Sequence, residues 1–205
     1  MTNKFAPRSE ADLLRLIAEH PRGWVVSQGP EGYGATPLPL LAETDASGRI
    51  VALFGHFALA NPHVAMLRAS PHATILFSGP NGYISPEPVS QPAWAPTWNY
   101  AVAQFDVDVQ LMPEENDAAL RQLVTFMERD RRVPWTVEKM GDRYARMLPH
   151  IVAFRAHVRT ARGRFKLGQD ESRTSFAEIV GALDDPQLRR WMEEFNSSDV
   201  TARTP

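Results

Sequence analysis

The clearest hydrophobic pattern in the chain is a strict alternation across residues 97–111. Apolar side chains occupy every second position from Ala101 to Leu111, and Gln or Asp fills most of the positions between them. This period of two predicts a long strand with one buried face. Shorter β-rich runs predict further strands at 23–27, 35–41, 49–54, 73–77, 83–85, 151–158 and 164–167.

Proline and glycine separate these predicted strands. Pro37 and Pro39 fall within the run at 35–41 and indicate an edge strand, because proline has no N–H to donate to a neighbouring strand. Ser47-Gly48 predicts a hairpin turn, and the Gly-Pro-Asn-Gly sequence at 79–82 predicts a second turn that reverses the chain. The proline-rich stretch from 85 to 96 can form neither a regular helix nor a central strand, so we expect a loop there.

Apolar residues at helical spacing predict the helices. Ser9 and Asp12 resemble a capping box at the start of a helix that ends near His20-Pro21. Further helices are predicted at 57–69, 113–129, 137–147, 176–180 and 188–195. The helix after Pro113 is expected to bury one apolar face, formed by Leu120, Leu123, Val124 and Met127. The apolar face of the last helix is expected to pack against another apolar surface.

The order of these elements favours an α+β protein built on a small antiparallel β-barrel, with peripheral and C-terminal helices. A chain of 205 residues suits one core with a helical annex. We therefore expect a single domain over 1–205, with a helical extension at about 171–205.

Composition narrows the function classes. The formal charge of −2 gives no general basic surface for nucleic-acid phosphates, so DNA binding would need a local patch. The chain has no cysteine, which excludes disulfides, thiolate metal sites and a cysteine nucleophile, and leaves redox chemistry to a bound cofactor. The N-terminal sequence lacks the apolar core of a signal peptide and no run is long enough to span a membrane, so a cytoplasmic location is expected.

Motifs of common catalytic sites are absent from the sequence. His56, His63 and His72 do not have metal-ligand spacing, which favours surface or structural histidines and predicts no metal site. The serines of the proline-rich loop do not stand in a G-x-S-x-G elbow. The glycines between 29 and 34 fit neither G-x-G-x-x-G nor a Walker sequence. No catalytic residue can be assigned.

The stretch from Asn81 to Tyr100 is the least ordinary part of the chain. It combines prolines with Tyr83, Trp94 and Trp98. These aromatic side chains have polar tips, and the backbone groups beside them are not used in strand pairing, so together they suit a flat, partly polar ligand. The alternative is that Trp98 and Tyr100 are core residues at the start of a strand. From composition alone, this alternative is favoured.

Four segments resemble the PaiB-like FMN-binding proteins, a family often labelled negative transcriptional regulators. They are TPLPLL at 36–41, FGHFALANP at 54–62, GPNGYISP at 79–86 followed by PTWNY at 96–100, and FKLGQ at 165–169. The resemblance implies an FMN-binding split β-barrel, an antiparallel six-stranded Greek-key barrel that usually dimerises and holds flavin near the subunit interface. It therefore implies FMN as cofactor and a homodimer.

The resemblance also implies which residues bind the cofactor. Carried over position by position, they are His56, Asn61, Tyr83, Ser85, Thr97, Trp98, Asn99, Lys166 and Gln169. FMN needs donors for its phosphate, polar groups for its pyrimidine edge and a wall for its ring. By this reasoning Lys166 and His56 would contact the anion, and Trp98 and Asn99 the flavin ring.

Three functional hypotheses follow. The first is a dimeric FMN-binding protein, with a regulatory or an oxidoreductase role. The second is a repressor acting on DNA, for which the only basic clusters are at 129–132 and 159–166, a pattern more typical of solvated faces. The third is a degenerate barrel without tight FMN binding, because Pro37 stands where relatives usually carry His, and Leu59 where they carry Arg or Lys.

Overall fold

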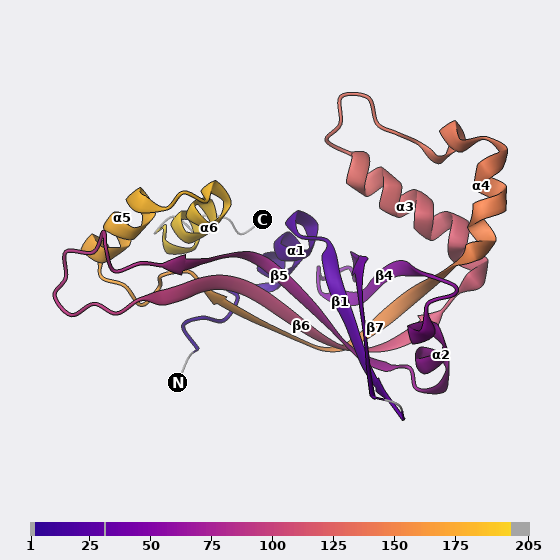
Figure 1. Ribbon diagram of the computed structural model, residues 1–205, viewed down its shortest axis with the longest axis horizontal. Helices are drawn as coiled ribbons and strands as arrows, with labels where there is room; N and C mark the ends of the chain where they lie inside the picture. Colours follow the sequence, from indigo (N-terminus) through magenta and orange to yellow (C-terminus); the bar gives the residue numbers. More distant parts are fainter. Residues whose placement is uncertain (1–2, 31, 198–205) are drawn as a thin grey trace.

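The computed structural model describes residues 3–30 and 32–197, and in them the chain forms one seven-stranded antiparallel sheet (Figure 1). The strands are β1 (Arg22–Gly29), β2 (Gly32–Pro39), β3 (Leu41–Thr44), β4 (Ile50–Ala58), β5 (His72–Ile84), β6 (Thr97–Leu111) and β7 (Ile151–Lys166). The α+β class predicted from the sequence is confirmed.

Helices connect and cover the strands. They are α1 (Glu10–Glu19), α2 (Pro62–Ala69), α3 (Asn116–Glu128), α4 (Asp142–Met147), α5 (Arg173–Ala182) and α6 (Pro186–Asn196), with short 3₁₀ turns at Pro113–Glu115, Val137–Met140 and Leu148–His150. The last eight positions of the predicted C-terminal extension, 198–205, lie outside the described residues.

One residue closes the sheet into a barrel. The strand order is β2-β1-β5-β6-β7-β4-β3, so β2 and β3 are its two edges, yet only Leu40 separates them in the chain. Because a single residue cannot cross a flat sheet, the sheet must curl until its edges meet. Leu40 is fully buried at this corner, and its N–H donates a 2.8 Å hydrogen bond to the carbonyl of Pro21.

Gly55 allows this closure. A Cβ atom there would lie 2.8 Å from the carbonyl oxygen of Pro39 and 2.7 Å from Leu40, so the corner can approach β4 only because the side chain is missing. The run at 35–41 was expected to form one edge strand. The corner at Leu40 divides it instead into two edge strands on opposite sides of the sheet, which is why the sheet has seven strands.

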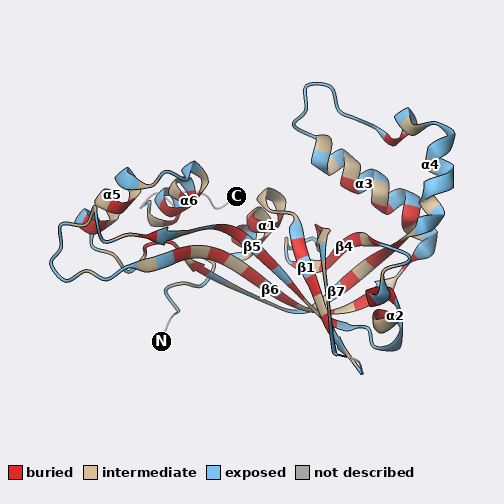
Figure 2. Ribbon diagram, in the orientation of Figure 1, coloured by how far each residue is buried: buried red, intermediate tan, exposed pale blue. Residues whose placement is uncertain are grey.

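Three strands extend beyond the barrel. β1 pairs with β5 only as far as Phe77, and β4 pairs with β7 only as far as His157. The remaining parts of β5 (78–84), β6 (97–104) and β7 (158–166) pair with no strand other than these three, and we call them the three-stranded arm. The arm and the barrel share one core, and Figure 2 shows buried residues alternating along the strands of both.

The C-terminal helices cover one face of the arm. Leu188, Trp191, Met192 and Phe195 of α6 are all buried, as expected for a helix whose apolar face packs on a partner. The rings of Trp191 and Phe195 pack edge-on against Phe165 of the arm, and the Trp191 indole donates a 2.8 Å hydrogen bond to Glu19 of α1. Within residues 3–30 and 32–197, no helix covers the opposite, outward face of the arm (Figure 1).

The turn predicted at 79–82 is wrong. β5 runs straight through these residues, with a bulge between Ser78 and Asn81 that places one extra residue opposite β6. A Cβ atom at Gly79 would lie 2.3 Å from Leu16 of α1, so this glycine makes room for a helix. Pro80 is tolerated because a bulge releases a ladder hydrogen bond.

Three smaller predictions also need correction. Residues 57–58 complete β4, so the helix expected at 57–69 begins only at Pro62. The helix expected at 137–147 is broken at Gly141, whose φ of 53° is left-handed. On α3 the buried positions are Asn116, Ala119 and Leu123, while Met127 is 47% exposed, because only the first half of the helix lies on β4 and β7.

Gly79→Ala is expected to destabilise the protein by about 1–3 kcal/mol, because the added methyl group collides with Leu16 beneath α1. The matched control is Gly181→Ala, since no atom lies near a Cβ at this position of α5. It should stabilise by about 0.5–1 kcal/mol. Urea unfolding monitored by tryptophan fluorescence measures both, and equal effects of the two substitutions would contradict the close packing at Gly79.

Candidate functional site

An exposed aromatic pair stands on the outward face of the arm. Tyr83 of β5 and Trp98 of β6 are register partners, so their side chains leave the same face of the sheet. Their ring centroids are 6.1 Å apart with planes inclined by 57°. The side chains are 55% and 51% exposed, unusually high for large aromatic residues in a regular strand pair. The pair forms a wall against which a flat ligand can lie.

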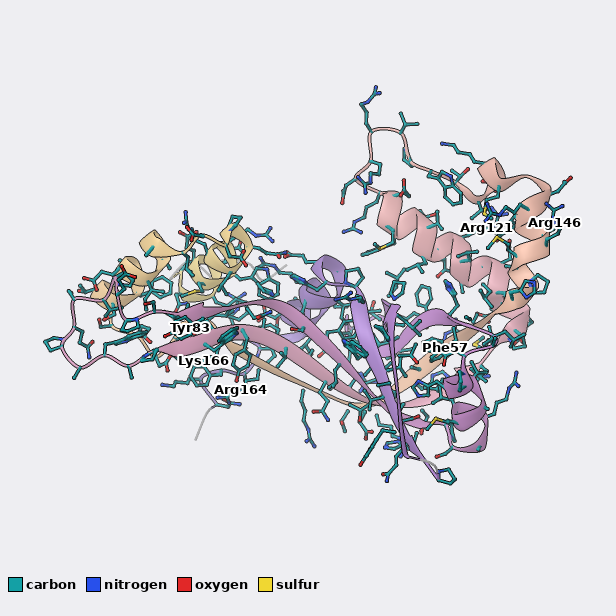
Figure 3. All side chains as sticks on the ribbon, in the orientation of Figure 1. Phe57, Tyr83, Arg121, Arg146, Arg164 and Lys166 are labelled. Carbon is teal, nitrogen blue, oxygen red and sulfur yellow. The ribbon has the colours of Figure 1, made fainter. Side chains whose placement is uncertain are left out.

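Cationic side chains border this wall. Lys166 lies opposite Tyr100 in the β6–β7 ladder, and its ammonium group donates a hydrogen bond to the Thr97 hydroxyl. Arg164 donates a 2.8 Å hydrogen bond to the hydroxyl of Tyr100. Figure 3 shows Tyr83, Lys166 and Arg164 near one another on the arm. Both cations have oxygen partners without charge, so each retains a full positive charge for an anion.

The outward face continues as an apolar surface towards β1. Trp24 and Leu76 are register partners there and are 45% and 40% exposed. Together with Val102 and Arg162 they line a shallow groove of about 400 Å³. A contiguous exposed apolar surface of this kind marks an interaction site.

Asn99 lies on the other side of the sheet. It follows Trp98 in β6, and successive strand residues point to opposite faces. Its side chain is 1% exposed beneath α6, where its amide nitrogen lies 3.5 Å from the sulfur of Met192. Its amide oxygen has no hydrogen-bond partner in the described part of the chain. While α6 is in place, Asn99 and Trp98 cannot contact the same flavin ring.

Two further candidates hold local backbone structure. The Ser85 hydroxyl accepts a 3.1 Å hydrogen bond from the N–H of Glu87 and shapes the start of the proline-rich loop. The Gln169 amide donates to the carbonyl of Phe165 at 2.6 Å and accepts from the N–H of Leu167 at 2.7 Å. Gln169 thereby fixes the turn that follows Lys166, a positioning role.

The proline-rich loop is fastened to α5. The Trp94 indole donates a 2.9 Å hydrogen bond to Glu171, and the N–H of Ser90 donates a 2.9 Å hydrogen bond to Glu178. Hydrogen bonds from Ser90 lower the pKa of Glu178. Trp94 therefore belongs to the loop anchor, while Tyr83 and Trp98 form the exposed wall.

His56 and Asn61 lie at the far end of the molecule. His56 pairs with Ala153 on β7, and Lys166 stands thirteen residues further along that strand, about 40 Å away along its length. Figure 3 shows the same separation, since Phe57, the neighbour of His56, lies well away from the arm. Asn61 caps α2, and its side-chain oxygen accepts a 2.9 Å hydrogen bond from the N–H of His63. Within one chain, a single FMN cannot contact both groups.

His56 keeps an unused polar atom. Its Nδ1 is buried and has no hydrogen-bond partner in the described part of the chain, and burial lowers its pKa. An orphaned buried nitrogen is costly unless a ligand or water satisfies it. This is the strongest indication that the barrel end of the chain contributes to a site.

A hydrogen-bonded network around His63 was not predicted from the sequence. The buried ring of His63 bridges Ser27 on β1, at 2.7 Å, and Thr36 on β2, at 2.9 Å. Asn61 completes the network with a 3.3 Å hydrogen bond to the same Thr36 hydroxyl. The motif residues Thr36 and Asn61 thus brace β1 and β2 against α2. Only the grouping of both motifs in one family could have suggested this contact.

The comparisons with known proteins define the class. Residues 1–160 match the family model described as "Putative FMN-binding domain", and the chain belongs to this family. Predicted membership of an FMN-binding split-barrel family, and FMN as its cofactor, are confirmed. The match ends within β7, before Lys166.

A particular relative is the "Protease synthase and sporulation protein PAI 2" of Bacillus subtilis (strain 168). It is 25% identical over 189 residues, which cover 89% of this chain and 88% of that protein. The resemblance to PaiB-like proteins noted from the sequence therefore holds over nearly the whole chain.

Solved structures share the fold at low sequence identity. The FAD and heme binding protein from Mycobacterium smegmatis has a TM-score of 0.59 at 14% identity, covering 98% of this chain and 93% of its own. The flavocytochrome Anf3 from Azotobacter vinelandii has a TM-score of 0.57 at 12% identity, with coverages of 78% and 69%. Each supports the split-barrel fold alone. Among the described residues, no helix is long and apolar enough to cross a membrane.

Protein stability is expected to fall as the pH falls below about 6.5, the ordinary histidine value. Burial lowers the pKa of His63, so the unfolded chain binds protons more readily than the folded one. The stabilisation is present above the unfolded pKa and is lost towards the folded pKa. Urea unfolding midpoints at pH 7.5 and 5.5 measure the loss, and His63→Gln should reduce it.

Thr36→Val is the matched control for this prediction. It removes one hydroxyl partner and keeps the imidazole, so it should cost about 1–3 kcal/mol at both pH values without flattening the pH dependence. An unchanged pH dependence in His63→Gln would contradict the assignment.

Proposed function

We propose that the chain binds FMN as a homodimer on the outward face of the arm. The observation that carries this proposal is the exposed Tyr83–Trp98 wall bordered by Lys166 and Arg164. It supplies an aromatic surface for the isoalloxazine ring and cations for the phosphate dianion. Bound FMN would supply one-electron and hydride-transfer chemistry.

The residues present fit the cofactor, with roles that differ from those suggested by the sequence. Lys166 holds the phosphate, with Thr97 positioning its ammonium group, and Trp98 covers the ring. Gln169 and Ser85 position the ends of the strands that carry these groups. Under this proposal Asn99 serves the packing of α6 and does not contact FMN.

The proposed site is shared between two protomers. Lys166 and His56 are about 40 Å apart along β7, so both can serve one FMN only if they come from different chains. The apolar surface around Trp24 and Leu76 gives a two-fold dimer a self-complementary contact on the same face. In such a dimer the partner's His56 faces the FMN that Lys166 holds.

In this proposed dimer, the two positions at which the chain departs from the family sequence lie in the barrel half of the shared site. Pro37 and Leu59 are exposed at the barrel end, and Leu59 is 42% exposed. In a shared site these positions belong to the protomer that contributes His56. The cations of the arm lie elsewhere, so both departures remove polar groups from the barrel half of the site and leave the arm half unchanged.

The proposal does not extend to direct DNA contact. Of the two basic clusters, the one at 159–166 lies on the arm, where it borders the flavin wall. The other, at 129–132, lies on the exposed connection after α3 and contains one acidic residue. A regulatory role, as in the family label, would then act through the flavin and the dimer.

Lys166→Met is expected to weaken FMN binding about 10- to 100-fold, because it removes a charged hydrogen bond worth roughly 1.5–3 kcal/mol. Quenching of FMN fluorescence on titration with protein measures the affinity. Lys139→Met is the matched control, since this lysine lies in an exposed turn near α4 and should keep wild-type affinity.

Two results would contradict the proposal. If Lys166→Met and wild type bind FMN with equal affinity, Lys166 does not hold the phosphate and the proposed site on the arm is wrong. A wild type that leaves FMN fluorescence unchanged at high micromolar concentration would favour the degenerate barrel instead.

A further inference from the structure

A second concave site lies away from the flavin face. α1 and α3 flank a groove of about 720 Å³ whose floor is the edge formed by β3 and β4. In Figure 1 the C-terminal half of α3 extends away from the sheet on this side. A volume of this size is typical of pockets that bind small organic molecules. None of its lining residues belongs to the arm.

Each element around the groove contributes apolar side chains to its lining. Leu14 and Ile17 come from α1, Leu41 and Phe54 from the strand edge, and Phe126 from α3. Leu41 and Phe54 also pack with Leu123 in a small cluster separate from the main core. The groove therefore has a rigid apolar floor, which favours an apolar ligand body.

The charged residues of the groove are both arginines. Within the described part of the chain, its lining includes Arg121 and Arg129 and no acidic side chain. Arg121 is neutralised, because Asp117 accepts its hydrogen bond at 2.9 Å and Glu138 forms a second ion pair. It is therefore not free to hold an anion.

Arg129 retains its charge at the mouth of the groove. Its strongest acceptor is the carbonyl of Phe126 at 2.7 Å, and the carbonyl of Ala18 across the groove lies at 3.4 Å. Its carboxylate neighbour, Asp130, lies at 3.4 Å and is 86% exposed, so water screens it. The guanidinium stacks on the Phe126 ring at 3.8 Å, which holds it over the apolar lining.

From this arrangement we propose that the groove binds a monocarboxylic acid with an apolar body, such as a medium-chain fatty acid. The body lies between α1 and α3, and Arg129 pairs with the carboxylate. Arg129, whose ion pair with Asp130 is exposed to water, matches one negative charge, whereas a phosphate dianion would need more donors.

Sodium decanoate, titrated into the full-length protein by calorimetry below its micellar concentration, tests the proposal. Wild type should bind decanoate, and Arg129→Gln should weaken binding about tenfold or more. Arg131→Gln is the matched control, because this exposed arginine does not line the groove, and it should bind as wild type does.

A second variant separates this groove from the apolar surface of the flavin face. Ala18→Phe places a ring into the groove from the exposed side of α1 and should abolish decanoate binding while leaving FMN affinity unchanged. Thr125→Phe does the same from α3, so the test survives if one variant fails to fold.

Three outcomes would overturn the proposal. The first is a wild type that releases no heat and shows no saturation with decanoate. The second is decanol binding as tightly as decanoate, which would mean that Arg129 does not pair with the carboxylate. The third is equal decanoate binding by wild type and both groove-filling variants, which would place the ligand outside the groove.

Discussion

The closure of the sheet at Leu40 is the constraint on which the rest of the structure depends. One buried residue joins two strands that are opposite edges of the same sheet, so the sheet must curl into a barrel that brings the two edges together. Closure uses only part of the long strands β5, β6 and β7. Their remaining length projects as the three-stranded arm, and the arm must bury one face elsewhere.

The two faces of the arm differ in what covers them. Its inner face is covered by α6, whose four buried apolar residues give this contact the character of a core. Its outward face keeps Tyr83 and Trp98 exposed and carries the half-buried Lys166. The arm also explains why the family residues fall into two groups, since His56 belongs to the closed barrel and Lys166 to the end of the arm. The proposed site shared between two protomers would bring His56 of one chain close to Lys166 of the other.

Much of the fold could be predicted where a pattern was long. The alternation at 97–111 predicted β6 residue for residue, because one face is buried along its whole length. The turn at 79–82 failed because the glycine makes room for Leu16, a residue distant in sequence. Of the cofactor-binding residues that the family resemblance implied, Trp98 and Lys166 both lie on the arm. The alternation could already have shown that Asn99 faces away from Trp98, whereas the distance from His56 to Lys166 required the register of β7.

The most direct test of the shared site is complementation between two homodimeric variants that each bind FMN weakly. Lys166→Met and His56→Gln are each expected to bind FMN weakly, and after exchange of subunits about half of the dimers are mixed. A mixed dimer with shared sites carries one doubly altered and one intact site, so tight FMN binding should return to about a quarter of all sites. If each protomer holds its own FMN, every site keeps one substitution. No recovery of tight binding after verified subunit exchange would contradict the account.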